Sequence, residues 1–365
     1  MIKNLELVNF KGFSDLSVRL KNLTVIAGQN GAGKSSLIQS LLLLRQSYQG
    51  KVEDFTPQFI FEGKLADLRN AFAVHTKNGD ERNTRISIDD DALDDEFWAE
   101  FPSREEKVVV NGVLSENYRE ALEKASLFAP SFVYLYANRM VPLPFYRKEQ
   151  DHYTDSRIGD KTGHLTGFLL QKLLDEKTEL AVQGLQFQAE IPRVSDNVSE
   201  WVSYVMGQKV AVQPKGREND NEIELSYIQD GERISPVNMA FGDTYVLPVI
   251  VAVMTAPKGS LIILENPEAH LHPSAQLRLG ELLAKAAQGG IQVIVETHSD
   301  HLLNGVRVAA KRNEIKADNV AIHYVWQDGD GHYDSDIELL QDGTLDSWPK
   351  GFFDEWEQAL RDINA

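Results

Sequence analysis

Residues Gly28–Ser36, GQNGAGKSS, have the types and spacing that suit phosphate chemistry, because they fit the pattern G-x-x-x-x-G-K-[ST]. Glycines allow a tight turn that brings backbone N–H groups close to phosphate oxygens. Lys34 adds a positive charge for the β- and γ-phosphates, and the Ser35 hydroxyl suits Mg²⁺. The pattern predicts a nucleoside triphosphate site formed by Gly28, Gln29, Asn30, Gly31, Ala32, Gly33, Lys34, Ser35 and Ser36.

Two further polar groups follow apolar segments that are typical of buried strands. Leu261–Glu265 ends in a carboxylate, and Ile291–Val295 is followed by a short polar run that contains His298. In an open parallel α/β sheet, ligands bind at the edge where the strands end. We therefore expect Glu265 and His298 to lie at the same edge as the phosphate loop, with Ser35 and Glu265 as ligands of Mg²⁺.

Local patterns predict the elements that position these groups. The apolar run Leu23–Ala27 predicts a strand and Leu37–Leu44 a helix, which is the strand–loop–helix context that the phosphate pattern requires. Apolar or alternating segments predict further strands at residues 1–10, 16–20, 85–88, 107–110, 132–137, 210–212 and 223–228. Helical patterns lie at residues 115–126, 163–177, 195–206 and 274–287. Acidic residues 89–106 predict a solvated loop and helix face, and residues 214–221 a polar turn.

Composition excludes some classes of protein. The chain has 365 residues, 42% of them hydrophobic, and no cysteine, so a disulfide framework and a thiolate metal site are excluded. The longest apolar run, Tyr245–Ala256, is too short to span a bilayer, so we expect a soluble, cytoplasmic protein without a membrane partner. A net charge of -18 argues against a large basic face. The best candidate for contact with nucleic acid is the region Arg139–Arg157, with Tyr146 and Tyr153.

The order of four motifs resembles the ABC-class ATPase heads. The motifs are GQNGAGKS, then AFGDT at Ala240–Thr244, then LIILENPEAHLHP, then ETHS. They resemble those of chromosome-maintenance heads, overcoming-lysogenization-defect nucleases and small AAA-type ATPases beside bacterial restriction and phage-defence genes. The ending DSWPKGFFDE resembles a C-terminal module, with the pattern WPxGFFDE, of one uncharacterised subgroup.

This resemblance implies the fold class and a division of the chain. It implies an α/β phosphate-loop NTPase of ABC-head type, with a mixed sheet, N-terminal antiparallel strands and an inserted helical/β lobe. The expected segments are the N-terminal half of the head at residues 1–75, the inserted lobe at 76–215, the C-terminal half at 216–345 and the terminal module at 346–365.

The resemblance also implies a mechanism. Two heads would pair head-to-tail with ATP and Mg²⁺ between the phosphate loop of one and Gly242 of the other, where a backbone N–H at a helix start contacts the γ-phosphate. His298 would be the switch histidine that reads the γ-phosphate, and the expected catalytic residues are Glu265, Glu268 and His298. The paired heads would regulate a partner effector, such as a nuclease, in anti-phage or DNA-related defence.

Two departures from the family pattern bear on hydrolysis. Where the family offers a serine, this chain has Ala240, so one hydroxyl contact is missing. Where the usual general base is expected, it has Asn266, and an amide cannot accept a proton from water. Glu268 is the candidate substitute, and hydrolysis is expected to be slow.

Two other hypotheses about function are compatible with the sequence. His270, His272, His298 and His301, with Glu268 and Asp300, could form a metal-dependent hydrolase or nuclease site. The chain could also be an interaction module that senses ATP and restrains a toxic partner.

Overall fold

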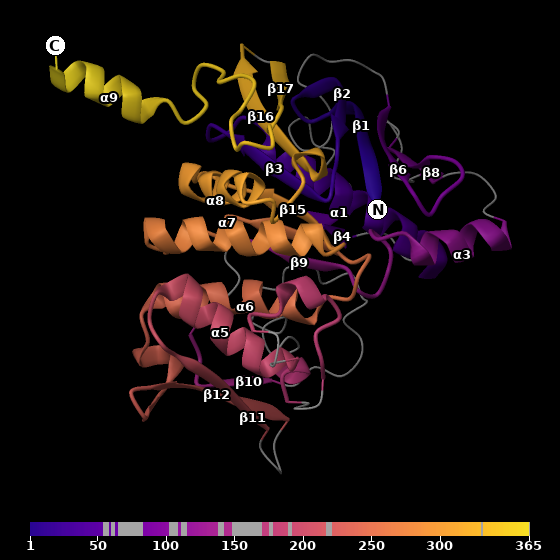
Figure 1. Ribbon diagram of the computed structural model, residues 1–365. Helices are drawn as coiled ribbons and strands as arrows, with labels where there is room; N and C mark the ends of the chain where they lie inside the picture. The colour runs from indigo at the N-terminus through magenta and orange to yellow at the C-terminus, as the bar shows by residue number, and fades with distance from the viewer. Residues whose placement is uncertain are drawn as a thin grey trace. The chain divides into compact units, whose positions relative to one another are not determined.

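The computed structural model describes residues 1–53, 58–59, 63–64, 83–101, 109–110, 115–137, 142–147, 170–174, 178–188, 192–216, 221–329 and 331–364 (Figure 1). The chain divides into two compact units. The first comprises Met1–Phe128, Glu296–Asp300 and Lys316–Ala365, and the second comprises Ala129–Val295 and His301–Ile315. The four segments expected from the sequence stay a prediction.

The first unit contains an antiparallel sheet in the order β2-β1-β6-β7-β8. Its strands are β1 (Ile2–Phe10), β2 (Phe13–Arg19), β6 (Thr84–Asp90), β7 (Phe97–Phe101) and β8 (Val109–Val110). The β1–β2 hairpin turns through Asn9 and Lys11, with φ values of 53° and 52°. Leu5, Leu7 and Ile86 are buried, so the sheet places one face in the core. The antiparallel strands expected near the N-terminus are confirmed.

The acidic segment 89–106 was expected to form a loop and a helix face, and this prediction is wrong for its described part. Phe97 and Phe101 are fully buried in β7, and they alternate with half-buried residues. That period of two is the signature of a strand, which the surrounding charges obscured. Asp90 is buried and accepts hydrogen bonds from the Ala92 N–H (2.9 Å) and the Ser126 hydroxyl (3.3 Å), so it is not a solvated carboxylate.

The strand that leads into the phosphate loop also belongs to the first unit. This strand, β3 (Leu23–Gly28), pairs in parallel with β16 (Val320–Asp328), so that Gly28 lies opposite Val325. Strand β17 (Gly331–Ile337) pairs antiparallel with β16. Helix α1 (Lys34–Glu53) begins directly after the glycine turn, as predicted. Tyr324 and the residues after it therefore lie at the same sheet edge as the phosphate loop.

A buried histidine ties three strands of this unit together. His323 in β16 is 1% exposed; its Nδ1–H donates to Asp334 of β17 (2.7 Å) and its Nε2–H donates to the Arg19 carbonyl of β2 (2.7 Å). Burial lowers the pKa of His323, but the hydrogen bond and charge of Asp334 and the Arg19 carbonyl outweigh it and raise the pKa above its usual value. The imidazole is therefore held as a cation that donates from both nitrogens.

Replacing His323 with glutamine is expected to lower the free energy of unfolding by about 1–3 kcal/mol at pH 6. The folded pKa of His323 is raised, so its stabilisation is fully present below the unfolded pKa and is lost as pH rises through the folded pKa. The difference in the free energy of unfolding between wild type and variant should therefore be smaller at pH 9 than at pH 6. Urea unfolding of both proteins at the two pH values measures it, and an equal difference at both would contradict the charged state assigned to His323.

The second unit combines a parallel strand set with helices and a smaller sheet. Strand β9 (Val133–Leu135) pairs in parallel with β14 (Leu261–Glu265), which neighbours β15 (Gln292–Glu296). The helices are α5 (Val194–Met206), α6 (Phe241–Thr255), α7 (Pro273–Gln288) and most of α8 (Asp300–Lys311), and α5 packs on α6 and α7. The smaller sheet contains β10 (Phe145–Arg147), β11 (Ala211–Gly216), β12 (Glu222–Gln229) and β13 (Glu232–Ile234).

Two expectations for this unit need correction. Pro214 was placed in a turn, but it lies within β11 and pairs with Leu225. This position is compatible with proline because β11 is at the sheet edge. Tyr146 was a candidate contact residue, but it is 3% exposed in β10 and its hydroxyl accepts the Leu143 N–H (3.1 Å). Arg139, Tyr153 and Arg157 lie outside the described residues, as does most of the helix expected at 163–177.

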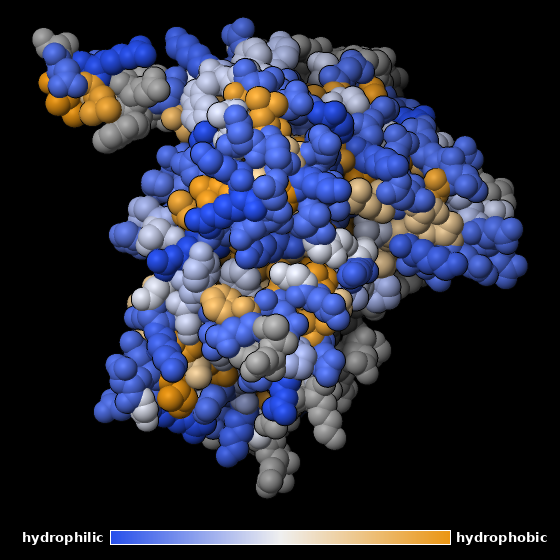
Figure 2. All heavy atoms as spheres, in the orientation of Figure 1, coloured by the Kyte–Doolittle hydropathy of each residue, from blue (hydrophilic) through white to orange (hydrophobic). Residues whose placement is uncertain are grey.

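The remaining elements include a helix at the C-terminus. Helix α9 (Glu355–Asn364) carries the exposed apolar residues Leu360 and Ile363, and Figure 2 shows the orange patch at the upper left. Helix α3 (Glu116–Lys124) begins at the predicted cap Ser115, whose hydroxyl accepts the Tyr118 N–H. The short elements are β4 (Gln58–Phe59), β5 (Gly63–Lys64) and the 3₁₀ turns Gln183–Leu185, Pro236–Asn238 and Ala317–Asn319.

Candidate functional site

The phosphate loop has the backbone that the sequence predicts. Gly28, Gly31 and Gly33 have φ values of 149°, 79° and 107°, which side chains other than glycine rarely adopt. The Ser36 N–H donates to the Gly33 carbonyl (2.9 Å) as helix α1 begins. The unpaired N–H groups of a helix start carry partial positive charge, so the loop is suited to bind an anion.

Two rings from other strands support this loop from one side. The His332 Nδ1–H of β17 donates to the Ala32 carbonyl (2.7 Å), and the His332 ring packs edge-on against Phe13. A Cβ at Gly33 would lie 2.8 Å from both His332 Nδ1 and Phe13 Cζ. Gly33 is thus required by the close approach of both rings as well as by its backbone angle. The sequence motif does not reveal His332, since it lies far along the chain.

The Lys34 ammonium spans the opening of the loop. Lys34 is 4% exposed, and its Nζ donates to the carbonyls of Gly28 (2.9 Å) and Gln29 (2.8 Å). Both acceptors are neutral, so a phosphate oxygen that entered the loop would offer Lys34 a stronger, charge-assisted partner. Gln29, Asn30 and Gly31 are exposed, which leaves the outer side of the loop open to a ligand.

Ser35 contacts Glu296, a carboxylate that is not among the site residues predicted from the sequence. Its Oγ donates to Glu296 Oε1 (3.0 Å), and Glu296 is 4% exposed at the end of β15. A hydroxyl and a carboxylate oxygen side by side are the kind of ligands that Mg²⁺ prefers. Glu296 directly follows the apolar run Ile291–Val295, so the end of that strand was the signal that could have identified it.

His298 lies on the same side of the loop. The preceding residue, Thr297, donates its N–H to the Ile26 carbonyl of β3 (3.0 Å), which fixes the segment against the phosphate-loop strand. Burial lowers the pKa of His298 from its usual value, and the positive charge of Lys34 lowers it further. The imidazole is therefore neutral at pH 7. Together with Gly28, Gln29 and Asn30, it lines a cavity of about 370 Å³.

In the second unit, Glu265 is held by two donors at the end of β14. It is 8% exposed and accepts the Tyr134 hydroxyl at Oε1 (2.8 Å) and the Ala137 N–H at Oε2 (3.4 Å). The hydroxyl of Tyr245 in α6 also donates to the Ala137 carbonyl. Tyr134 belongs to β9, the parallel neighbour of β14, and so holds the carboxylate at the strand end. Sequence reasoning identified the strand of Tyr134 but not this contact.

The residues after Glu265 form two tight turns. The Ala269 N–H donates to the Asn266 carbonyl (3.1 Å), and the Leu271 N–H donates to the Glu268 carbonyl (3.0 Å). Asn266 has a φ of 43°, a left-handed conformation that asparagine tolerates better than most residues. This backbone gives a structural reason for the amide. Glu268 is 7% exposed, so the carboxyl group proposed as the base is mostly shielded from water.

Gly242, in the signature segment (Ala240–Thr244), lies in the first turn of α6. A Cβ there would come 2.7 Å from the His270 carbonyl, so only glycine allows the helix to approach this loop. The His270 ring packs against Phe241 and Tyr245, with centroid distances of 4.6 and 5.1 Å. The signature segment is thus joined directly to the loop that follows Glu265.

The described residues do not support the hypothesis of a metal-dependent hydrolase or nuclease site. Within them, no group of three or more His, Cys, Asp or Glu side chains is arranged to hold a metal ion. His270 packs between aromatic rings, and His272 Nδ1 accepts the Ser274 N–H as the cap of α7. His298 belongs to the first unit, whereas His270, His272 and His301 belong to the second.

The structure therefore gathers the predicted residues in two sets. The first unit brings Lys34, Ser35 and His298 together with Glu296, and the second brings Glu265, Glu268 and Gly242 together.

Within the described part of the chain, no helix is both long and apolar enough to cross a bilayer.

Comparison with solved structures shows the fold of a chromosome-maintenance head. The SMC head bound to the C-winged helix domain of ScpA matches with a TM-score of 0.55 at 15% identity, over 93% of this chain and 98% of that chain. The SMC head from Thermotoga maritima matches with a TM-score of 0.50 at 13% identity, over 93% and 99%. A Pyrococcus furiosus SMC head with an extended coiled coil, bound to the C-terminal domain of ScpA, matches with a TM-score of 0.54 at 14% identity, over 100% and 99%.

Family models cover most of the chain, whereas no curated protein matches it. Residues 315–363 match a family described as "Protein of unknown function (DUF3696)". Residues 23–304 match the family described as "AAA domain, putative AbiEii toxin, Type IV TA system". These matches confirm the predicted α/β phosphate-loop head of the ABC class. The chain belongs to this AAA family.

Proposed function

We propose that this protein is an ATP-gated clamp. In this proposal ATP and Mg²⁺ pair two copies head-to-tail, and the pairing controls a partner effector. The observation that carries the proposal is the gathering of Lys34, Ser35, Glu296 and His298 beside one phosphate loop. An ammonium, a hydroxyl, a carboxylate and a neutral imidazole are the groups that would bind, orient and read a triphosphate with its metal ion.

The residues of the first unit have separate roles in binding. The loop N–H groups and the Lys34 ammonium would bind the β- and γ-phosphates, and Lys34 would exchange two neutral carbonyls for charged oxygens. Mg²⁺, when bound, supplies positive charge that offsets the charge on the phosphates. Ser35 and Glu265 are the proposed ligands, with Glu296 as a further carboxylate beside Ser35.

The start of α6 supports the pairing of two copies. Ala240 is exposed at its cap, and the apolar side chains of Val237 and Phe241 are 55% and 45% exposed. Burying these two side chains would be favourable, and the partial positive charge at a helix start favours a nearby anion. In the proposed pair, a second copy covers these apolar side chains, and the phosphates of its bound ATP face the start of α6.

Hydrolysis is proposed to be slow, and the effector is proposed to be a separate chain. Asn266 cannot accept a proton, which leaves the mostly buried Glu268 as the base. No nuclease motif is evident in the sequence, so any cleavage of DNA would come from the partner. The toxin–antitoxin description of the family supports a role in bacterial defence.

Sedimentation velocity tests the pairing. With Mg²⁺ and a non-hydrolysable ATP analogue, the wild-type mass should double relative to ADP. Phe241→Asp should stay monomeric while binding the analogue normally, because a charge replaces an exposed apolar group at the proposed interface. Leu340→Asp changes another exposed apolar residue and serves as the control. An unchanged mass for wild type, or equal effects of both variants, would contradict the proposal.

A further inference from the structure

The cavity beside the phosphate loop has a second wall that comes from the end of the chain. The cavity is lined by Gly28, Gln29, Asn30 and His298 together with Tyr324 and the segment 351–353. This segment belongs to the C-terminal turn, which we define as residues 349–353. All these residues lie in the first unit, so the turn and the phosphate loop are parts of one compact body.

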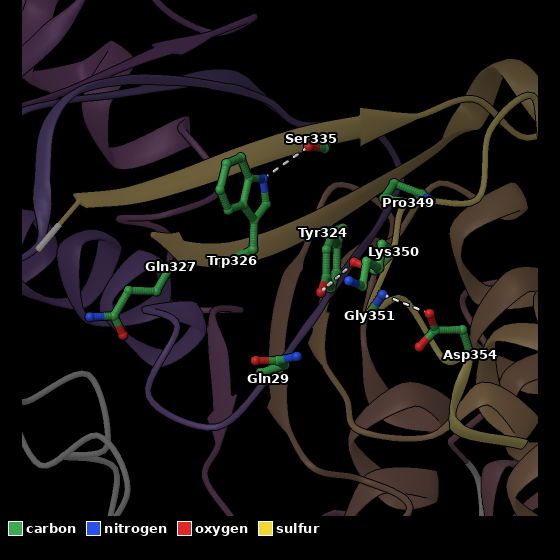
Figure 3. A pocket seen from close by; sticks show the side chains of 9 residues that line it. All are labelled: Gln29, Tyr324, Trp326, Gln327, Ser335, Pro349, Lys350, Gly351 and Asp354. Atoms are coloured by element: carbon green, nitrogen blue, oxygen red, sulfur yellow. Dashed lines mark hydrogen bonds between the residues drawn. The ribbon is translucent and has the colours of Figure 1, made fainter. Parts of the chain in front are cut away.

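Hydrogen bonds and ring packing fix the C-terminal turn on strand β16. The Tyr324 hydroxyl donates to the Lys350 carbonyl (3.3 Å), and the Gly351 N–H donates to Asp354 Oδ2 (3.0 Å) (Figure 3). The Phe352 ring is 1% exposed and packs against Tyr324 and Trp348, with centroid distances of 5.4 and 5.1 Å. The turn is therefore an anchored part of the structure.

Gly351 allows the turn to approach the phosphate loop closely. Its φ is +85°, and a Cβ would lie 2.5 Å from the Tyr324 hydroxyl oxygen and 3.2 Å from Gln29 Nε2. Gln29 is a phosphate-loop residue, and Figure 3 shows it below the turn. The same three residues also line a neighbouring cavity of about 610 Å³, so they border both spaces.

Phe353 lines the smaller cavity and has an energetically unfavourable backbone conformation. Its φ is 52°, in the left-handed region that bulky side chains rarely adopt. Such strain costs about 1–3 kcal/mol and persists only where the surrounding structure imposes it, often at ligand sites. Phe353 directly follows the buried Phe352, and its apolar side chain lines the same cavity as His298.

The cavity lies at the end of the loop where the γ-phosphate would bind. The Lys34 ammonium contacts the carbonyls of Gly28 and Gln29, both of which line the cavity. His298 lines it too, and the neighbouring Thr297 N–H donates to the Ile26 carbonyl of β3, the strand that leads into the loop. In phosphate loops this lysine reaches the β- and γ-phosphates.

We propose that the C-terminal turn is the γ-phosphate wall of the nucleotide site and that Phe353 makes the site favour ATP over ADP. The inference rests on the proposed ATP binding. The γ-phosphate of ATP fills the space between Lys34, His298 and Phe353, whereas ADP leaves it empty. The apolar wall excludes water from that space, which strengthens the attraction between the phosphate and Lys34. Phe353 is a specificity-determining residue and takes no part in proton transfer.

Titration calorimetry with a non-hydrolysable ATP analogue and with ADP tests this role. Phe353→Ala is expected to weaken binding of the analogue by roughly tenfold, because water enters beside the phosphate, and to change ADP binding less than about twofold. Phe353→Leu keeps an apolar wall and should retain the preference. Ile363→Ala, which changes a side chain 78% exposed on α9, is the control within the C-terminal segment and should match wild type.

Tyr324→Phe is a second variant that tests the proposed wall if Phe353→Ala does not fold. It removes the hydroxyl that holds the Lys350 carbonyl, so the preference for the analogue should fall, by less than in Phe353→Ala. Equal loss of both nucleotides, or no change in either variant, would overturn the proposed wall while ATP binding by wild type stands. A wild-type protein that binds neither nucleotide would overturn the proposed function and this inference together.

Discussion

Replacing Lys34 with alanine is expected to abolish ATP binding. The ammonium is 4% exposed and already aims two hydrogen bonds across the loop opening, so it is positioned before a ligand arrives. Hydrogen bonds to charged groups contribute about 1.5–3 kcal/mol each, so the loss of two such bonds from Lys34 to the phosphates weakens ATP binding by about a hundredfold or more. Titration calorimetry with ATP and Mg²⁺ measures the loss.

Lys3→Ala is a matched control for this prediction. It removes the same charged group from the same unit, but the Lys3 side chain is 61% exposed and pairs with Asp91. Lys3→Ala should bind ATP as wild type does. Near-normal ATP binding by Lys34→Ala, with the folded state verified by circular dichroism, would show that the phosphate loop is not the nucleotide site.

Replacing Glu268 with glutamine is expected to stop hydrolysis and to trap the ATP-bound pair. A general base contributes roughly 100- to 10,000-fold, and glutamine preserves the shape of the side chain while removing its basicity. Steady-state phosphate release should fall by about that factor. Sedimentation velocity should then show dimers that persist in ATP, whereas wild-type dimers decline as ATP is consumed.

Glu296→Gln separates the base from a metal-binding role. Glu296 contacts Ser35, so its loss is expected to raise the Mg²⁺ concentration needed for half-maximal hydrolysis. If Glu268→Gln hydrolyses ATP at the wild-type rate, Glu268 is not the base. If Glu296→Gln traps dimers instead, Glu296 is the general base.

The sequence predicted those parts of the site that depend on local patterns. The phosphate loop, the strand that ends at Glu265 and the cap at Ser115 were found because periodicity and motif spacing are local properties. Strand β7 was missed because charged neighbours hid the alternation of Phe97 and Phe101. Pro214 was misplaced because a single sequence does not show which strand lies at a sheet edge.

Contacts between distant parts of the chain were beyond the reach of local patterns. Glu296 meets Ser35, and His332 meets Ala32, only because the fold of the first unit brings Glu296 and β17 to the phosphate loop. The same holds for Phe353, whose motif was noted without a role. Tertiary packing decides these pairings, and hydrophobic periodicity carries no information about them.

The absence of cysteine from the chain allows the most direct test of head-to-tail pairing. Asn30→Cys, in the exposed part of the phosphate loop, and Ala240→Cys, at the start of α6, are purified separately and then mixed with a short bismaleimide. Calorimetry first verifies that each variant still binds ATP. Head-to-tail pairing predicts a cross-linked dimer in the mixture, dependent on ATP and Mg²⁺ and absent when either variant is treated alone. A mixture that gives no ATP-dependent cross-link, or an equal yield from Ala240→Cys alone, would contradict it.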